Sequence, residues 1–585
     1  MWIFNPQKEI TMKKFIKYFL TIAFALSLGA CSEDFLNYVP EDQATVNSWY
    51  RNAEEIRAAT ASLYGRPWWS FTDVFMWVAG DLMPGDMHHN WDQEGQFFYA
   101  SYNENNSHIA AGWQGLYDVI SFANLIIDDM PDVARGYGVS EEAIKAGLAE
   151  ARFFRGVAFF LLAEYWENVP IIENPADKVT AGDLLLPKNT VSSVYEFVRR
   201  DLVFAAENLP PTDIPGRVTS WAAKGMLAKL HVTIGQRKIG NPSFPSTTAD
   251  DFAAAASYAA DVINNSGLTL YGDYENMFKI ENEHNPEILF SLQMINGGWS
   301  YGSSRQARFA RHTRITGDAT AWGGGKGMTI NFVNTLIQNA GSETDKRRRA
   351  IYMELDDYYD YIAKKEGGYT YKIVSRDENG TQMEGATPTL NSLKKHVVGG
   401  VDDHGYLITN QDSPFDLYML RLADVYLLYA EALLAGGDQL TSGPGYEAYL
   451  KVRERAGLKP PSDGNMTFVD LFNERRIELA LEAQSWLDVK RRYYRNPTEA
   501  LAYLNGQNRT DRYFRILEAT SQENDPKGYE LVAAGQVGSR PDNKNEDPVV
   551  TFNADKMTLP IPGAQVVSNP LLSESAEPVE YEFSE

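Results

Sequence analysis

The sequence has little of three things: cysteine, long apolar runs and positive charge. Cys31 is the only cysteine among 585 residues, so no disulfide can form within the chain and a core must stabilise the fold. The apolar run from Phe15 to Leu28 is shorter than the about 20 residues that a permanent membrane-spanning helix needs, and no later stretch is long and apolar enough. Lysine and arginine number 54 against 78 acidic residues, which leaves a net charge of -24. This balance argues against a nucleic-acid backbone as the main partner, because phosphate binding needs a basic footprint.

Apolar and aromatic side chains, in contrast, are plentiful. Hydrophobic residues make up 44% of the chain and aromatic residues 12%. A disordered chain would be poorer in aromatics and a multispan membrane protein far more apolar, so this composition indicates a soluble globular protein. By length alone the chain has room for roughly three or four domains, unless a large helical array forms one unit.

The N-terminus has the pattern of a secretory signal peptide, residues 1–30. Lys13, Lys14 and Lys17 precede the apolar run, and small residues lead up to Cys31. Met12 is the more natural start of this segment. Leu28-Gly29-Ala30-Cys31 resembles the lipobox of bacterial lipoproteins, which implies that Cys31 becomes the lipidated first residue; the alternative is a free thiol after an ordinary cleavage site.

Helical periodicity dominates the rest of the chain. Apolar residues recur at steps of three and four in several stretches, which predicts helices at 141–166, 191–209, 220–236, 250–265, 420–434 and 468–494. Pairs of such helices joined by short turns predict a mainly α fold with a tetratricopeptide-like helix-pair scaffold and little β structure, although no strict 34-residue period is readable.

Two long irregular regions interrupt these helices. One extends from Gly65 to Gly112 and the other from about 296 to 414, and both are rich in aromatic residues. Loops of this length in a compact protein are usually functional or disordered, and their aromatic content argues against disorder.

Several motifs in this order resemble the SusD/RagB lipoproteins of Bacteroidota. They cover nearly the whole chain after the lipobox and comprise 113–117 (WQGLY), 149–155 (AEARFFR), 165–170 (YWENVP), 421–432 (RLADVYLLYAEA), 452–458 (VRERAGL), 474–479 (ERRIEL) and 559–562 (LPIP). The resemblance implies one SusD-like unit from 31 to 585, with an N-terminal part at 31–280 and a C-terminal SusD/RagB part at 281–585.

The same resemblance implies the role of the protein. Members are cell-surface lipoproteins of the outer membrane that capture glycans and deliver them to a SusC-like TonB-dependent transporter. Ser32-Glu33-Asp34 resembles the acidic tract that directs such lipoproteins to the outer leaflet, while the alternative interpretation is a solvated tether. No catalytic residue, metal or cofactor is expected for this role.

Charged residues in the helical motifs are expected to stabilise the scaffold. Arg421, Glu431 and 474–478 lie on predicted helices, where exposed pairs three or four residues apart contribute only about 0.2–0.5 kcal/mol.

Three patterns resemble catalytic or metal sites without completing them. The pair Asp402-Asp403, like Asp356-Asp357, has the residue type for acid–base chemistry on a glycosidic bond, but adjacent loop acids are mostly solvated. Gly298 to Gly302 matches G-x-S-x-G around Ser300, with His404 as the candidate base, although Gly302 to Ser304 does not indicate the helix that must follow. His88-His89 lacks a spaced set of further ligands.

Glycan capture calls for flat aromatic surfaces with hydrogen-bonding groups at their edges. We assign Trp91 as a stacking surface with Asp86, His88 and Asn90 as hydroxyl partners. The opposing set, in the middle region that forms the other wall in relatives, is Trp299, Tyr301, Arg305 and Trp322. Any of these rings has a structural alternative, since large loop aromatics often pack a loop onto its scaffold, whereas Trp113 and Trp166 are expected in the core.

Three functions remain open from the sequence. The leading one is a non-catalytic glycan-binding lipoprotein that works with a transporter. The others are a surface enzyme that cleaves glycans, and a protein that captures peptide or glycoprotein.

Overall fold

The computed structural model describes residues 49–89, 92–182, 185–309, 315, 326–354, 357–371, 391–405, 408, 412–509, 511–515, 537–541 and 550–583. The signal segment, Cys31, Asn90, Trp91 and Trp322 lie outside these residues. Within them, no helix combines the length and the apolar character that crossing a membrane requires.

Helices form most of the structure. Their bounds are α3 (Ala53–Ala61), α4 (Asp92–Phe98), α5 (Ser107–Gly136), α6 (Glu141–Trp166), α7 (Pro175–Ala181), α8 (Val191–Asn208), α9 (Ser220–Gly240), α10 (Asp251–Asn265), α11 (Arg305–Phe309), α13 (Ile330–Ala340), α14 (Arg348–Ile351), α15 (Val401–His404), α16 (Leu422–Leu434), α17 (Pro444–Arg455), α18 (Phe468–Glu478), α19 (Ser485–Arg495), α20 (Pro497–Asn505) and α21 (Gly563–Ser568).

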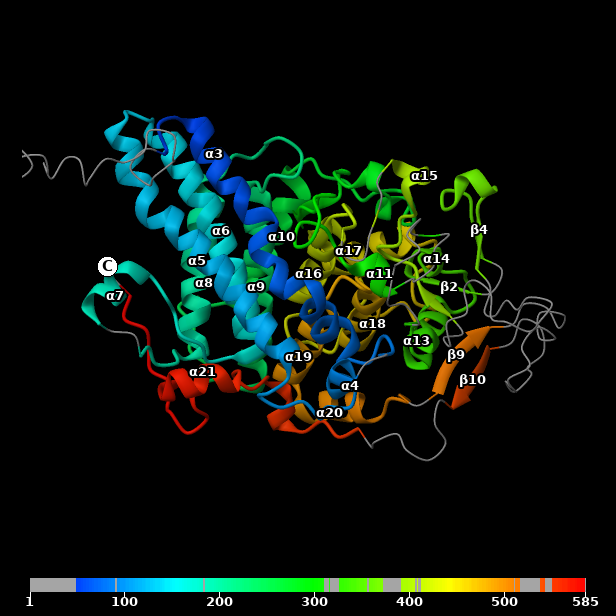
Figure 1. The fold of residues 1–585 in the computed structure, drawn as a ribbon. Helices are drawn as coiled ribbons and strands as arrows, with labels where there is room; N and C mark the ends of the chain where they lie inside the picture. The colour runs from blue at the N-terminus through cyan, green and yellow to red at the C-terminus, as the bar shows by residue number, and fades with distance from the viewer. Residues whose placement is uncertain are drawn as a thin grey trace, which may run out of the picture.

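The long helices pack side by side in a row. In chain order α5 contacts α6, α6 contacts α8, α8 contacts α9, and α9 contacts α10; α10 then packs on α16 and α16 on α17 (Figure 1). Helices such as α5 and α6, joined by residues 137–140, run antiparallel. The expected mainly α scaffold of helix pairs is confirmed.

Local sequence signals account for several helix starts. The Ser140 hydroxyl accepts a hydrogen bond from the Ala143 N–H at the start of α6, and the Asp250 carboxylate caps α10 by accepting from the Ala253 N–H. Helix α8 ends one residue before the expected limit, ahead of Pro210, and α9 continues four residues past it.

The single helix expected over 468–494 is wrong. The chain forms α18 and α19, separated by a turn in which Leu481 and Ala483 take left-handed φ angles of 62° and 59°. The Ala483 N–H donates to the buried carboxylate of Asp81, at 3.2 and 3.1 Å from its two oxygens. A contact with a residue about 400 positions away therefore sets this break, and the helical periodicity carries no sign of it.

The first irregular region is also more ordered than expected. It contains π-helical turns at Phe71–Phe75 and Val78–Leu82 and then α4, and α5 begins within it at Ser107. Trp68 and Trp77 are fully buried. Most of its aromatics therefore build the core, which is the structural alternative named above.

Strands are short and paired two by two. β1 (Ile288–Leu292) pairs antiparallel with β6 (Leu417–Arg421), which takes Leu420 out of the helix expected from that residue. The other pairs are β2 (Tyr352–Met353) with β5 (Ser392–Leu393), β3 (Tyr358–Tyr359) with β4 (Tyr369–Thr370), β7 (Gln439–Leu440) with β8 (Met466–Thr467), and β9 (Asp511–Arg515) with β10 (Val537–Pro541).

One hydrophobic cluster extends from Tyr50 to Leu559 and so includes residues of both expected parts of the chain. Trp113 and Trp166 are 4% and 2% exposed, which confirms their expected place in the core. The Trp166 Nε1–H donates to the Pro560 carbonyl at 3.0 Å, so a motif near the end of the chain covers the end of α6.

Candidate ligand-binding site

An aromatic surface stands on the loop that follows β1. Trp299 is 68% exposed and Tyr301 39% exposed. The Trp69 ring, from the other end of the sequence, lies against Trp299 with ring centroids 5.5 Å apart and planes inclined at 56°. We call Trp69, Trp299 and Tyr301 the aromatic platform. The Arg66 guanidinium lies over the Tyr301 ring, 5.5 Å from its centroid, and places hydrogen-bond donors beside the platform.

Asp412 holds the platform loop in place. Its Oδ1 accepts hydrogen bonds from the Gly297 and Gly298 N–H groups at 2.9 and 2.8 Å, and its Oδ2 accepts from Asn296 Nδ2 at 3.0 Å. The chain then turns tightly, with left-handed φ angles at Gly298 (89°) and Ser300 (71°). Such a conformation is uncommon for serine and persists only where neighbours hold it. The exposed rings therefore sit on a pre-organised support.

Asp86 does not reach this surface. Its side chain is fully buried, and its carboxylate accepts hydrogen bonds from Arg476 Nε and the Ser485 hydroxyl. Both carboxylate oxygens of Asp86 are bonded inside the protein, so Asp86 connects the segment after the π-helical turn Val78–Leu82 to α18 and α19. It is a scaffold residue here and not the hydroxyl partner that the sequence suggested.

His88 and Arg305 are likewise 2% exposed. The His88 ring packs 5.6 Å from the Phe98 ring. Arg305 begins α11 and is so enclosed that burial lowers the pKa of its guanidinium to about 10, while the Asp81 carboxylate acts in the opposite direction. Neither side chain offers a polar edge to a ligand at the surface, so both assignments are corrected.

The segment around Asp86 and the middle region, which the sequence assigned to opposite walls of the site, are joined by backbone hydrogen bonds. The His88 N–H donates to the Gly327 carbonyl at 2.8 Å, and the Thr329 N–H donates to the Asp86 carbonyl at 2.9 Å. Asn90, Trp91 and Trp322 fall outside the described residues, so their assignment stays a prediction.

The charged helix motifs form a buried network rather than exposed pairs. Arg421 Nη1 lies 2.5 Å from Glu287 and 2.9 Å from Glu478, and its Nε lies 2.7 Å from Glu482. All of these side chains are almost fully buried. The scaffold role expected for Arg421 holds, but its partners lie on other elements. Removing one partner of such a buried pair costs more stability than removing one partner of an exposed pair.

The enzyme-like patterns have other bonding partners. Asp403 accepts hydrogen bonds from the N–H groups of Ala363, Lys364 and Gly400, and the His404 ring lies 3.2 Å from the Gly399 carbonyl. Asp402 pairs with Lys365. Within the part of the chain that the structure describes, no three His, Cys, Asp or Glu side chains are grouped to hold a metal ion.

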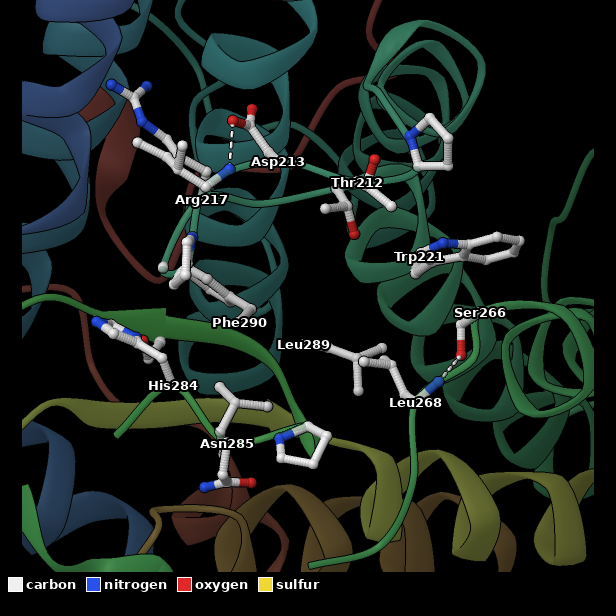
Figure 2. Close-up of a pocket in the computed structure, with 18 residues that line it drawn as sticks. Thr212, Asp213, Arg217, Trp221, Ser266, Leu268, His284, Asn285, Leu289 and Phe290 are labelled. Carbon is white, nitrogen blue, oxygen red and sulfur yellow. Dashed lines mark hydrogen bonds between the residues drawn. The ribbon is translucent and has the colours of Figure 1, made fainter. Parts of the chain in front are cut away.

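A pocket of about 250 Å³ lies between the α8–α9 loop and β1 (Figure 2). Trp221 stands at one side of it in this view, and His284 and Phe290 at the other, with Thr212 and Leu289 between. Sequence reasoning did not single out this pocket.

No local pattern in the sequence indicates a role in the site for Trp69, Arg66, Asp412 or the pocket. Trp69 was visible only as one of many aromatics in its region, and Asp412 as one loop acid among several. The Gln293 N–H donates to the Tyr64 carbonyl at 2.9 Å and so joins the segment that leads to Trp299 to the segment that leads to Arg66 and Trp69, while Asp412 bonds to the platform loop from a third segment. No local pattern reports such a contact.

Comparisons with known proteins agree with this architecture. The SusD family profile matches residues 286–577, and a second profile, described as starch-binding associating with outer membrane, matches residues 34–232. A SusD-like protein of Bacteroides ovatus is 32% identical over 568 residues, which cover 96% of this chain and 97% of that protein. SusD-like protein P2 of Formosa agariphila is 26% identical and covers 81% and 90% of the two chains.

A solved structure supports the same assignment. A crystal structure with a xylogluco-oligosaccharide is 30% identical, has a TM-score of 0.75, and covers 91% of this chain and 100% of that one. With both family profiles matching in order and a relative of 32% identity along nearly the full length, the chain belongs to the SusD family.

Proposed function

We propose that this protein is a glycan-binding lipoprotein that captures oligosaccharide or polysaccharide at the outer face of the outer membrane. It passes the glycan, uncleaved, to a SusC-like TonB-dependent transporter. The aromatic platform makes the first contact with the sugar chain.

The observation that carries the proposal is the exposed ring of Trp299, with the half-buried ring of Trp69 packed against it. Exposed aromatic side chains that adjoin one another mark binding surfaces more often than single exposed rings do, and here Trp299, Tyr301 and Trp69 adjoin on a loop that Asp412 holds in place. Sugar rings have apolar faces that stack on indole, and hydroxyl rims that suit the donors of Arg66. Asp412 keeps the loop ordered before binding, which lowers the entropy cost of capture.

The first ligand to test is indicated by the relatives. The 30% identical structure was solved with a xylogluco-oligosaccharide, so xyloglucan oligosaccharides head a panel of soluble glycans. The bonding of Asp403 and His404 to backbone groups supports binding without cleavage.

The test is calorimetric titration of the mature chain against this panel, followed by assay of the recovered ligand for new reducing ends. Trp299→Ala and Trp69→Ala should each weaken binding by about tenfold or more, because each removes one stacking surface. Phe122→Ala is the matched control, since Phe122 is an exposed ring on α5 and is 47% exposed. Unchanged affinity in both tryptophan variants would contradict the proposal.

Other outcomes of the same panel favour the alternatives. New reducing ends would support a glycan-cleaving enzyme. Binding of peptides or glycoproteins in place of free glycans would support peptide capture, for which aromatic rings beside Arg66 are also suited.

Membrane attachment and the transporter are tested separately. Cys31→Ala should leave the protein unlipidated and release it from the outer membrane, as cell fractionation and mass spectrometry of the N-terminus would report. Affinity purification of the lipidated protein from its own cells should recover a TonB-dependent transporter.

A further inference from the structure

The pocket beside β1 has a mixed lining suited to one sugar unit. Its apolar side is formed by Leu268, Leu289 and the half-exposed ring of Trp221 (Figure 2). On its polar side, the exposed side chains of Thr212 and His284 make no hydrogen bond to another described residue. An aromatic ring at one side of the pocket, with an uncommitted hydroxyl between and an uncommitted imidazole at the other side, offers a carbohydrate both kinds of contact that it needs (Figure 2).

The charges in the pocket wall are already paired. Asp213 binds Arg57, with oxygen to nitrogen distances of 2.7 and 3.0 Å. Arg217 Nη1 lies 2.8 Å from Glu150. Because neither sign of charge is left over, the wall favours a neutral sugar over a uronic acid or an amino sugar.

The same pairs make the pocket rigid. Besides binding Glu150, Arg217 donates from Nη2 to the Arg57 carbonyl at 2.6 Å and from Nη1 to the Thr60 hydroxyl at 2.9 Å. The loop between α8 and α9 is thereby fastened to α3. A pocket held in this way needs little ordering when a ligand enters.

Gln293 links the pocket to the segments that bear the aromatic platform. Gln293 Nε2 donates to the carbonyl of Gly216, which lines the pocket. The Gln293 N–H donates to the carbonyl of Tyr64, and the chain then continues directly into the turn that bears Arg66. From Ser291 in the pocket to Ile295 at the base of the platform loop, four residues span about 13 Å at about 3.3 Å each. One oligosaccharide is long enough to reach both.

We infer that this pocket is a second subsite, which takes one neutral sugar unit of the chain that lies on the aromatic platform. The inference rests on the proposed function and deepens it: the protein selects neutral chains long enough to fill both places. Trp221 supplies the stacking surface, and Thr212 and His284 supply the hydrogen bonds.

The test is a length series of neutral xylogluco-oligosaccharides, titrated against the wild type and against Thr212→Trp. Thr212 is exposed, so a bulky side chain there obstructs the pocket without removing core contacts. In the wild type, chains long enough to reach the pocket should bind about three- to tenfold tighter than short chains, the gain that one aromatic contact supplies. In Thr212→Trp this gain should fall below about twofold, while short chains bind as before.

Matched variants separate the possible failures. Val567→Trp places the same bulk at a side chain of α21 that is 84% exposed, and it should keep the full length dependence. Trp221→Ala should lose the gain as Thr212→Trp does. An acidic oligosaccharide series should show no gain in any variant.

The proposed function and this inference fail in different ways. If the wild type binds no glycan of the panel, or if Trp299→Ala and Trp69→Ala both bind with unchanged affinity, the proposed function is wrong and the subsite with it. If Trp299→Ala loses binding but Thr212→Trp and Trp221→Ala retain the wild-type length dependence, only the subsite is refuted.

Discussion

Replacing Arg421 by methionine should destabilise the protein far more than the loss of a surface charge. The Arg421 guanidinium is fully buried and lies within 3 Å of the carboxylates of Glu287, Glu478 and Glu482. The surrounding cluster balances its charges: cations Arg347, Arg421, Arg453, Arg455 and Lys395 face carboxylates Asp345, Glu287, Glu474, Glu478 and Glu482. Arg421→Met leaves one negative charge uncompensated inside the core.

The expected cost is about 3–5 kcal/mol, the range seen when one partner of a buried ion pair is removed. Against a total stability of about 5–15 kcal/mol this is a large fraction. Arg135→Met is the control: the Arg135 side chain is 49% exposed, its 2.7 Å pair with Glu141 is screened by water, and only a small loss is expected.

Urea and thermal unfolding of the mature chain, followed by tryptophan fluorescence, measure both losses. The deficit of Arg421→Met should also depend on pH. In the wild type the arginines hold the pKa of Glu478 at about 2 despite burial. Without Arg421, one carboxyl of the cluster has a raised pKa in the folded state. Because its negative charge destabilises the fold only when the carboxyl is ionised, the loss of unfolding free energy should be smaller at pH 5 than at pH 8. The reasoning would be refuted if Arg421→Met lost no more unfolding free energy than Arg135→Met, or if its loss were larger at pH 5 than at pH 8.

Three further predictions concern single positions. Burial and the Asp416 carboxyl raise the pKa of Glu283 to about 8, so the melting temperature of the wild type should fall between pH 5 and pH 9, and Glu283→Gln should fall less. Gly80→Ala places a Cβ 2.5 Å from the Ala483 Cα, which should cost about 1–3 kcal/mol in urea unfolding. Asp412→Asn replaces one carboxylate oxygen by a donor that repels the platform loop's N–H groups, and titration should show about three- to tenfold weaker glycan binding with unchanged circular dichroism.

Local patterns in the sequence were enough to locate most helices. The expected helix over 141–166 has these bounds in α6, and the Ser140 hydroxyl caps its first turn. Helix propensity, capping and amphipathic spacing act over three or four residues, so they can be read directly. The same signals failed over 468–494, where Asp81 bonds to the turn before α19 and Asp86 bonds to Ser485 at the start of α19.

The candidate site was predicted only in part. Trp299 and Tyr301 are exposed, as a binding role requires, whereas Asp86, His88 and Arg305 are buried. A loop residue's type does not say which way its side chain faces, because its burial depends on segments hundreds of residues away.

The sequence by itself determined the helical scaffold and the family motifs, and it carries the lipobox at Cys31, because each is encoded in neighbouring residues. Only the tertiary structure decided that Trp69 meets Trp299, that Asp412 fastens the loop that bears Trp299, and that the α8–α9 loop and β1 form the pocket at Trp221. These contacts join distant segments, and their existence follows from how the whole core packs rather than from any local pattern.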